Sequence, residues 1–168
     1  VSGRVFDATD LSLLTESALD FWLTTGRFND AFEQKLGAWL GAKWLYTVNS
    51  GSSANLVAFS ALTSPLLRER ALQPGDEVIL FEPAYDSYIP AIQLAGATPV
   101  PLPLQVPGYR IDWDAVRGAL TPRTRMIVLN TPNNPGTSVL GVEDVAMLAA
   151  VTRDRPIVVI SDEVYEHM

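Results

Sequence analysis

The sequence contains no cysteine and a single histidine among its 168 residues. The absence of cysteine excludes disulfide bonds, thiolate metal sites and a cysteine nucleophile within this chain. The one histidine, His167, leaves little for histidine-based metal binding or a catalytic triad, and we expect it to be a solvated residue near the chain end. Lysine is scarce as well. We interpret Lys35 and Lys43 as solvated residues beside an amphipathic helix, residues 28–41, whose apolar face we expect to be buried.

Basic residues are outnumbered and long apolar runs are missing. Lysine and arginine total 12 against 19 acidic residues, which gives a net charge of −7, and no basic cluster interrupts that balance. Nucleic acid and anionic membranes are therefore not expected as partners. No stretch approaches the roughly 18 apolar residues of a membrane span, and the first ten residues lack the pattern of a signal peptide. We therefore expect a cytoplasmic protein.

The composition that remains is that of a globular protein with a core, because 48% of the residues are hydrophobic and 18% are charged. A chain of this length buries about 70% of the surface that it exposes when unfolded. We expect an N-terminal segment over residues 1–27 and a single domain over residues 28–168.

Hydrophobic spacing from residue 28 onward alternates between helical and extended segments. Several of the expected strands are apolar on both faces, which is typical of a mainly parallel sheet covered by helices on both sides, so the sequence predicts an α/β fold. We expect Pro90 in the first turn of its helix, the prolines near residue 100 on an edge strand, and Asp112 as a helix cap. Helices are predicted over residues 28–41, 52–64, 85–96, 112–120 and 141–154, and strands over residues 44–49, 77–82, 98–104, 125–130 and 157–161.

Polar residues follow three of the predicted strands, where ligands of open α/β sheets bind. The first group is "VNSGSSAN", in which Gly51 allows a tight turn and Ser52 and Ser53 open a helix. Backbone N–H groups and hydroxyls at such a helix start point at an anion, usually a phosphate. The motif lacks the lysine of a P-loop. A serine that only caps the helix remains an alternative.

The second group is "LNTPNNPG", whose prolines and glycine hold Asn130, Asn133 and Asn134 near a strand end. An asparagine amide there can donate to a ligand oxygen, although the segment also reads as a turn built of good turn formers. The third is Asp162, at the tip of the last predicted strand. Its charge is costly unless a ligand, a salt bridge or a helix cap satisfies it. Together, the three groups fit a ligand with a phosphate, a ring oxygen and a basic ring nitrogen, as in pyridoxal phosphate.

Two family resemblances extend this interpretation. The stretches "PGDEVILFEPAYDSYIPAIQLAGATPVPLPL", "NTPNNPG" and "VISDEVYEHM", over about residues 74–168, resemble the large domain of class I/II aminotransferases of the kynurenine and methionine type. Residues 18–79 resemble the DegT/DnrJ/EryC1 sugar aminotransferases, with most likeness to the CDP-4-keto-6-deoxyglucose 3-dehydrase branch. The two meet near "PGDEV". Both families share the aspartate aminotransferase-like fold, pyridoxal-phosphate fold type I, and its cofactor, pyridoxal 5′-phosphate.

The resemblance implies a cofactor role for seven residues. Asp162 matches the acidic residue that pairs with the pyridine nitrogen of the cofactor. Tyr85 matches the aromatic residue that stacks on the cofactor ring. Asn134 and Tyr165 match the residues that bind the ring hydroxyl. The phosphate-binding turn corresponds to Gly51, Ser52 and Ser53.

The family's Schiff-base lysine follows the "SDEVY" strand, and no lysine of this chain matches it, so we assign no catalytic residue. A basic residue beside the phosphate and a carboxylate-binding arginine are also without a match. We expect a fragment, inactive alone, of a homodimeric aminotransferase that acts on an amino acid and a 2-oxo acid. A nucleotide-sugar aminotransferase or 3-dehydrase, and a non-catalytic cofactor-binding or dimerisation module, remain as alternatives.

Overall fold

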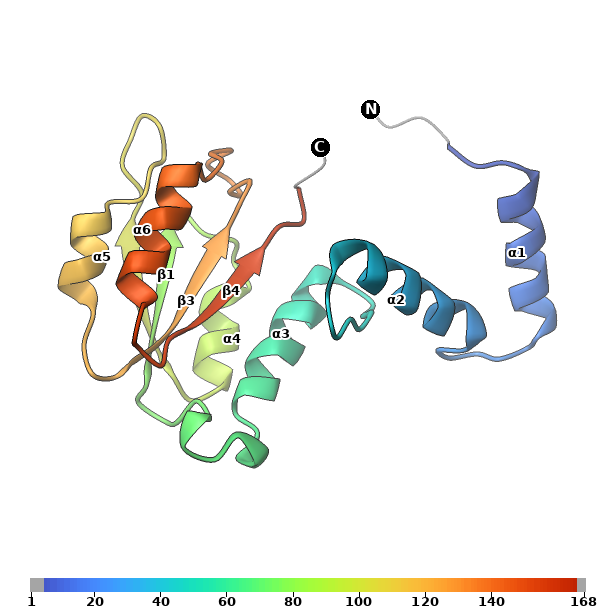
Figure 1. Ribbon diagram of the computed structural model, residues 1–168, viewed down its shortest axis with the longest axis horizontal. Helices are drawn as coiled ribbons and strands as arrows, with labels where there is room; N and C mark the ends of the chain where they lie inside the picture. The colour runs from blue at the N-terminus through green and yellow to red at the C-terminus, as the bar shows by residue number, and fades with distance from the viewer. Residues whose placement is uncertain (1–4, 166–168) are drawn as a thin grey trace. The chain divides into compact units, whose positions relative to one another are not determined.

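The structure is a computed structural model that describes residues 5–165 (Figure 1). Contacts within the chain divide it into two compact units, residues 1–48 and residues 49–168. Each unit is described by itself below. His167 lies outside the described residues, so its predicted solvated role stays a prediction.

The first unit contains helices α1 (Ala8–Leu19) and α2 (Arg27–Leu40). The sequence analysis did not predict α1. Its start is fixed by a capping box in which the Asp7 carboxylate accepts from the backbone N–H of Thr9 and Asp10, while the Asp10 carboxylate accepts from the N–H of Asp7. These bonds satisfy amides that have no partner inside the helix. Helix α2 ends at Gly41, whose positive φ of 66° suits glycine.

Two predictions for this unit were wrong. Residues 44–49 form no strand. The backbone N–H of Thr47 instead donates to the Glu33 carboxylate over 2.8 Å, which ties the segment to α2 and lowers the pKa of Glu33. The apolar face of α2 was expected to be buried, yet Phe32, Trp39 and Leu40 are more than half exposed. The described part of this unit, residues 5–48, contains no sheet that could cover this face.

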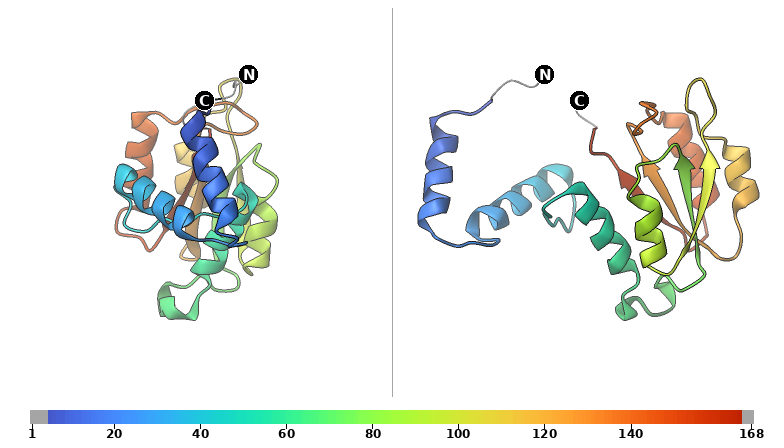
Figure 2. Two further views of the ribbon diagram at one scale, coloured as in Figure 1. Left: turned by 90° about the vertical axis from the view of Figure 1, so that its right-hand side faces the viewer. Right: turned by 180° about the vertical axis from the view of Figure 1, so that it is seen from behind.

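The second unit is built on a four-stranded sheet in the order β2-β1-β3-β4, with every neighbouring pair parallel. The α/β prediction is therefore confirmed. Figures 1 and 2 show the strands running side by side with helices on both faces. The strands are β1 (Glu77–Glu82), β2 (Thr98–Pro103), β3 (Thr124–Asn130) and β4 (Val158–Asp162), and the helices are α3 (Gly51–Leu62), the 3-10 helix η1 (Pro65–Arg70), α4 (Tyr88–Leu94), α5 (Trp113–Ala119) and α6 (Val142–Thr152).

Alternating side chains of β1 and β3 pack into two separate hydrophobic cores, one on each face of the sheet. Val78 and Leu80 pack with residues of α3 and α4 on one face of the sheet, where Phe59 and Ile92 are buried. Side chains at the intervening positions, such as Ile79, pack with α5 and α6 on the other face. Because the central strands are buried on both faces, their carboxyl ends are held rigidly.

The details at the sheet edges are partly as predicted. Pro90 lies in the first turn of α4, β2 is an edge strand, and the Asp112 carboxylate caps α5 by accepting from the N–H of Asp114 and Ala115. The prediction that residues 157–161 are buried on both faces was wrong. Val158 and Val159 are 40% and 36% exposed, because β4 is the other edge of the sheet. No helix within residues 5–165 is long and apolar enough to cross a membrane.

Candidate functional site

A cavity of about 270 Å³ lies where the carboxyl ends of β3 and β4 meet the loop after β1 and the start of α3. Ligands of open α/β sheets bind in this position. Six of the seven residues that the sequence analysis selected line it, and Ser53 does not. The lining consists of Ser50, Gly51, Ser52, Tyr85, Tyr88, Asn130, Asn134, Asp162, Val164 and Tyr165.

The start of α3 forms one wall of the cavity. Ser50 is the N-cap, and its hydroxyl accepts from the N–H of Ser53 over 3.2 Å. Ser53 thus serves the cap. Gly51 and Ser52 line the cavity as the first two residues of α3, where backbone N–H groups have no acceptor inside the helix. Helix capping therefore involves Ser50 and Ser53, whereas Gly51 and Ser52 remain the candidate anion-binding residues.

Two tyrosines stand on the opposite wall. Tyr88 is buried at 2% exposure, whereas Tyr85 is half-buried. Their ring centroids lie 5.8 Å apart and the ring planes meet at 79°, an edge-to-face arrangement that aromatic pairs favour. The Tyr85 hydroxyl also lies 3.0 Å from the hydroxyl of Ser52, so the two share a hydrogen bond.

Asp162 is the last residue of β4 and its carboxylate is held on both oxygens. The Tyr88 hydroxyl donates to Oδ2 over 2.7 Å, and the backbone N–H of Val164 donates to Oδ1 over 3.3 Å. Burial first, and then the bond to the Asp162 carboxylate, raises the pKa of Tyr88, so this phenol stays a proton donor. The Asp162 carboxylate, for which the sequence indicated no partner, therefore accepts hydrogen bonds from a phenol and a backbone amide.

The "NTPNNPG" turn is fixed by its own amides. The Asn130 side chain accepts from the N–H of Asn134 over 2.6 Å and donates to the backbone oxygen of Asp162 over 3.1 Å, which joins β3 to β4. Asn134 then faces Tyr165, with its amide nitrogen 3.4 Å from the phenol oxygen. Asn133 is buried and holds the turn by accepting from the N–H of Gly136. It does not line the cavity.

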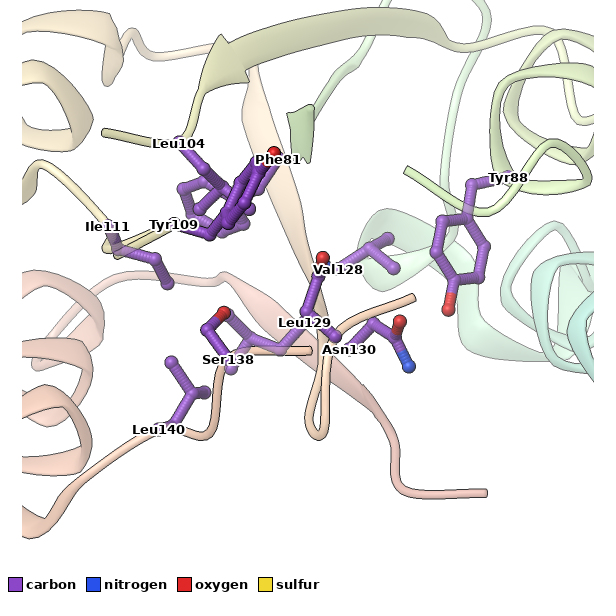
Figure 3. Close-up of a pocket in the computed structure, with 11 residues that line it drawn as sticks. Phe81, Tyr88, Leu104, Tyr109, Ile111, Val128, Leu129, Asn130, Ser138 and Leu140 are labelled. Carbon is purple, nitrogen blue, oxygen red and sulfur yellow. The ribbon is translucent and has the colours of Figure 1, made fainter. Parts of the chain in front are cut away.

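A second, smaller cavity of about 20 Å³ lies beside the first, and Tyr88 and Asn130 line both. Figure 3 shows Phe81, Leu104 and Tyr109 gathered around it, with Tyr88 on the other side of β3. The two cores meet at this strand end. The small volume and mainly apolar lining of this second cavity indicate that it is a packing gap beneath the site.

The larger cavity combines a carboxylate, two side-chain amides, three phenols and a helix start. Among the described residues that line it, Asp162 carries the one formal charge, since no lysine or arginine is present there. The arrangement can accept a hydrogen bond from a protonated ring nitrogen, donate to a ring oxygen and surround an anion. Those are the three groups of pyridoxal phosphate, so the residues fit that cofactor.

Sequence reasoning assigned no role to Tyr88, Ser50 or Val164, which also line the cavity. It named Asn130 only as one of three asparagines that could donate to a ligand oxygen. The available signal for Tyr88 was its position three residues after Tyr85, which places the two phenols about one helical turn apart. That spacing could not show which residue the hydroxyl reaches, because Asp162 is 74 positions away in the sequence.

Known proteins resemble most of this chain in sequence and in fold. The family model described as aminotransferase class I and II matches residues 20–168. Over 76% of this chain, the sequence is 50% identical to the lipopolysaccharide biosynthesis protein RfbH of Salmonella typhimurium. Over 58% of this chain, it is 48% identical to a probable N-succinyldiaminopimelate aminotransferase, DapC, of Mycobacterium tuberculosis. It spans 29% and 25% of those relatives. The crystal structure of YbdL from Escherichia coli, a methionine aminotransferase, superposes with a TM-score of 0.66 at 39% identity, covering 83% of this chain and 36% of that one.

Proposed function

The chain belongs to the aminotransferase class I and II family, whose members are pyridoxal-phosphate-dependent enzymes, and we propose that its cavity is the cofactor site of an aminotransferase. The reaction would move an amino group between an amino acid and a 2-oxo acid. The observation that carries this proposal is the position of Asp162, with its carboxylate in the same cavity as the start of α3 and the Asn134 amide.

Each wall has a role toward the cofactor. Gly51 and Ser52 bind the phosphate, and the ring of Tyr85 stacks on the pyridine ring. Asn134 and Tyr165, which face one another over 3.4 Å, bind the ring hydroxyl from two sides. The Asp162 carboxylate receives the ring N–H. A carboxylate at close range raises the pKa of such a nitrogen by about 1–3 units, so Asp162 holds the proton on it. When bound, the protonated cofactor withdraws electrons from the substrate carbon that loses its proton.

The reaction requires two groups that do not line this cavity, a basic residue for the phosphate and a lysine that carries the cofactor. A helix start contributes only about 0.3–1 kcal/mol to anion binding, or ~2 kcal/mol at best, so a basic residue has to complete the phosphate site. The lysine that carries the cofactor in this family has to be supplied too. We propose that both lie outside these 168 residues, in a cytoplasmic homodimer in which residues 28–168 are part of the large domain, and that the chain alone has no sustained transaminase activity.

The test is a titration of the purified chain with pyridoxal 5′-phosphate, followed by the absorption of the cofactor. We expect saturable, reversible binding that Asp162→Asn weakens. A variant with both Lys35→Arg and Lys43→Arg controls for reaction of the aldehyde with surface lysines, and it should bind as the wild type does. Binding that disappears in this lysine variant, or that Asp162→Asn leaves unchanged, would rule out the proposed site.

A nucleotide-linked keto sugar is the second candidate substrate, favoured by the identity of 50% to a lipopolysaccharide biosynthesis protein. Stable phosphopyridoxyl conjugates separate the candidates without requiring turnover. A conjugate with methionine should bind more tightly than pyridoxal phosphate if an amino acid is the substrate. A conjugate with an amino-sugar nucleotide should bind more tightly than pyridoxal phosphate if a sugar is the substrate.

A further inference from the structure

Tyr88 makes a contact that packing alone does not require. Its ring is buried in the core formed by α3, α4 and one face of the sheet, together with Phe59, Leu80 and Ile92. A phenylalanine would fill the same space. The hydroxyl instead leaves the apolar core at the floor of the cavity and donates to Asp162 Oδ2 over 2.7 Å.

This bond fixes the orientation of the carboxylate. With Tyr88 on Oδ2 and the Val164 N–H on Oδ1, rotation of the carboxylate about its bond to Cβ would break both hydrogen bonds. Each oxygen keeps further acceptor capacity, since an ionised carboxylate offers about four lone-pair positions. A ligand N–H therefore meets an acceptor that is already oriented, and little side-chain entropy is lost when it binds.

We infer that Tyr88 is a positioning residue that holds the Asp162 carboxylate toward the ring nitrogen of the cofactor and keeps the shared proton on that nitrogen. The inference rests on the proposed function. A hydrogen bond donated to the ionised carboxylate stabilises its charged form, which is the form that accepts the ring N–H. The buried phenol donates to Asp162 without taking up a charge of its own.

Tyr88 also packs against the stacking ring, which lies in the loop before α4. Tyr88 meets Tyr85 edge-to-face at 5.8 Å between centroids, and the Tyr85 hydroxyl is held by Ser52. The start of α4 thus fixes both the partner of the ring nitrogen and the aromatic ring that covers the cofactor. Tyr88 acts through these neighbours and is assigned no contact with the substrate.

The test compares two ligands, pyridoxal 5′-phosphate and its 1-deaza analogue, in which a C–H replaces the ring nitrogen. Dissociation constants are measured for the wild-type chain, Tyr88→Phe, Asp162→Asn and the double variant. We expect Tyr88→Phe to weaken binding of pyridoxal phosphate about tenfold, the effect of one hydrogen bond to a charged group, and to leave binding of the analogue unchanged. In the Asp162→Asn background the same substitution should have no further effect. Tyr109→Phe, which removes a hydroxyl outside this cavity, is the matched control.

An equal loss for both ligands would mean that Tyr88 only supports the fold, and no loss for either would mean that the bond is dispensable. Both results overturn the inference while the proposed function stands, provided that Asp162→Asn still weakens binding of pyridoxal phosphate. A wild-type chain that does not prefer pyridoxal phosphate over the analogue overturns both. If Tyr88→Phe does not fold, proton NMR of the wild type decides. The Tyr88 hydroxyl resonance should shift when pyridoxal phosphate binds and stay in place with the analogue, and a resonance unmoved by both ligands counts against the inference.

Discussion

The hydroxyl groups of Ser52 and Tyr85 lie 3.0 Å apart, which joins the start of α3 to the loop after β1 across the candidate site. The proposed phosphate turn and the proposed stacking ring are thus in direct contact. A phosphate bound at the start of α3 would compete with Tyr85 for the Ser52 hydroxyl. The contact therefore links the phosphate end of the site to its aromatic wall.

Removing the two hydroxyls separately should have different effects. Ser52→Ala should weaken binding of pyridoxal 5′-phosphate about fivefold, because it removes one hydrogen bond to the phosphate, worth about 1 kcal/mol. Tyr85→Phe keeps the stacking ring and frees Ser52, so affinity should stay within about twofold of the wild type. Calorimetry with pyridoxal, which lacks the phosphate, is the control. A loss of pyridoxal affinity in Ser52→Ala would show that Ser52 does not act through the phosphate.

Gly136→Ala should destabilise the turn that carries Asn134. A Cβ at position 136 would lie 2.6 Å from Asn133 Oδ1 and 3.0 Å from Tyr109 Cγ, so the turn has to shift. We expect a loss of about 1–3 kcal/mol in the free energy of unfolding, the usual cost of overpacking, measured by urea denaturation. The control is Gly118→Ala in α5, where an added Cβ meets nothing within 4 Å. That change should be stabilising by about 0.5–1 kcal/mol, and an equal loss at both positions would contradict the steric explanation.

Glu77 should make the stability of the chain depend on pH in the acid range. Its buried carboxylate accepts from the Thr121 hydroxyl over 2.5 Å and from the Arg123 guanidinium over 2.7 Å. Those bonds, the Thr121 bond most of all, lower the pKa of Glu77 below the ordinary glutamate value of 4.5. The unfolded chain binds the proton more readily than the folded chain, so the stabilisation is fully present above pH 4.5 and is lost as the pH falls through the lower, folded-state pKa.

Glu77→Gln removes this charge with little change of shape. The variant should be less stable than the wild type at neutral pH by about 1–3 kcal/mol, since it leaves Arg123 without its charged partner. Urea denaturation at a series of pH values measures the difference, which should shrink toward acid. A difference that is constant from neutral pH to pH 3 would exclude the carboxylate as its source.

Much of the second unit could be predicted from local sequence. Residues 78–81 of β1 and 126–129 of β3 are apolar and buried without interruption, because both faces of these two strands are covered. Asp112 caps α5 as its position before "WDAV" predicts. The carboxyl ends of the parallel strands share one edge, which brings Tyr85, Asn134, Asp162 and Tyr165 to one cavity. Gly51 and Ser52 also line it, from the start of α3 and not from the strand that was predicted before them. Their roles toward the cofactor, and the domain boundary expected near residue 27, stay predictions.

The remaining features depend on contacts that no local pattern encodes. Residues 44–49 have a strand-like composition, yet a side chain of α2 takes the N–H of Thr47 that a strand would offer to a neighbour. "IVVIS" has the composition of a buried strand but lies at the edge of the sheet, and strand order is not a local property. Asp162 lacked a partner in the sequence because Tyr88 comes from a helix far earlier in the chain.

The central claim is that Asp162 holds a proton on the ring nitrogen of pyridoxal phosphate. The most direct measurement is the ¹⁵N chemical shift of ring-labelled pyridoxal 5′-phosphate bound to the purified chain, which distinguishes a protonated from a neutral pyridine. The wild type should give the protonated shift at a pH above the pKa of the free cofactor nitrogen, and Asp162→Asn should give the neutral shift. A neutral nitrogen in the wild type, or the same shift in both proteins, would contradict the account.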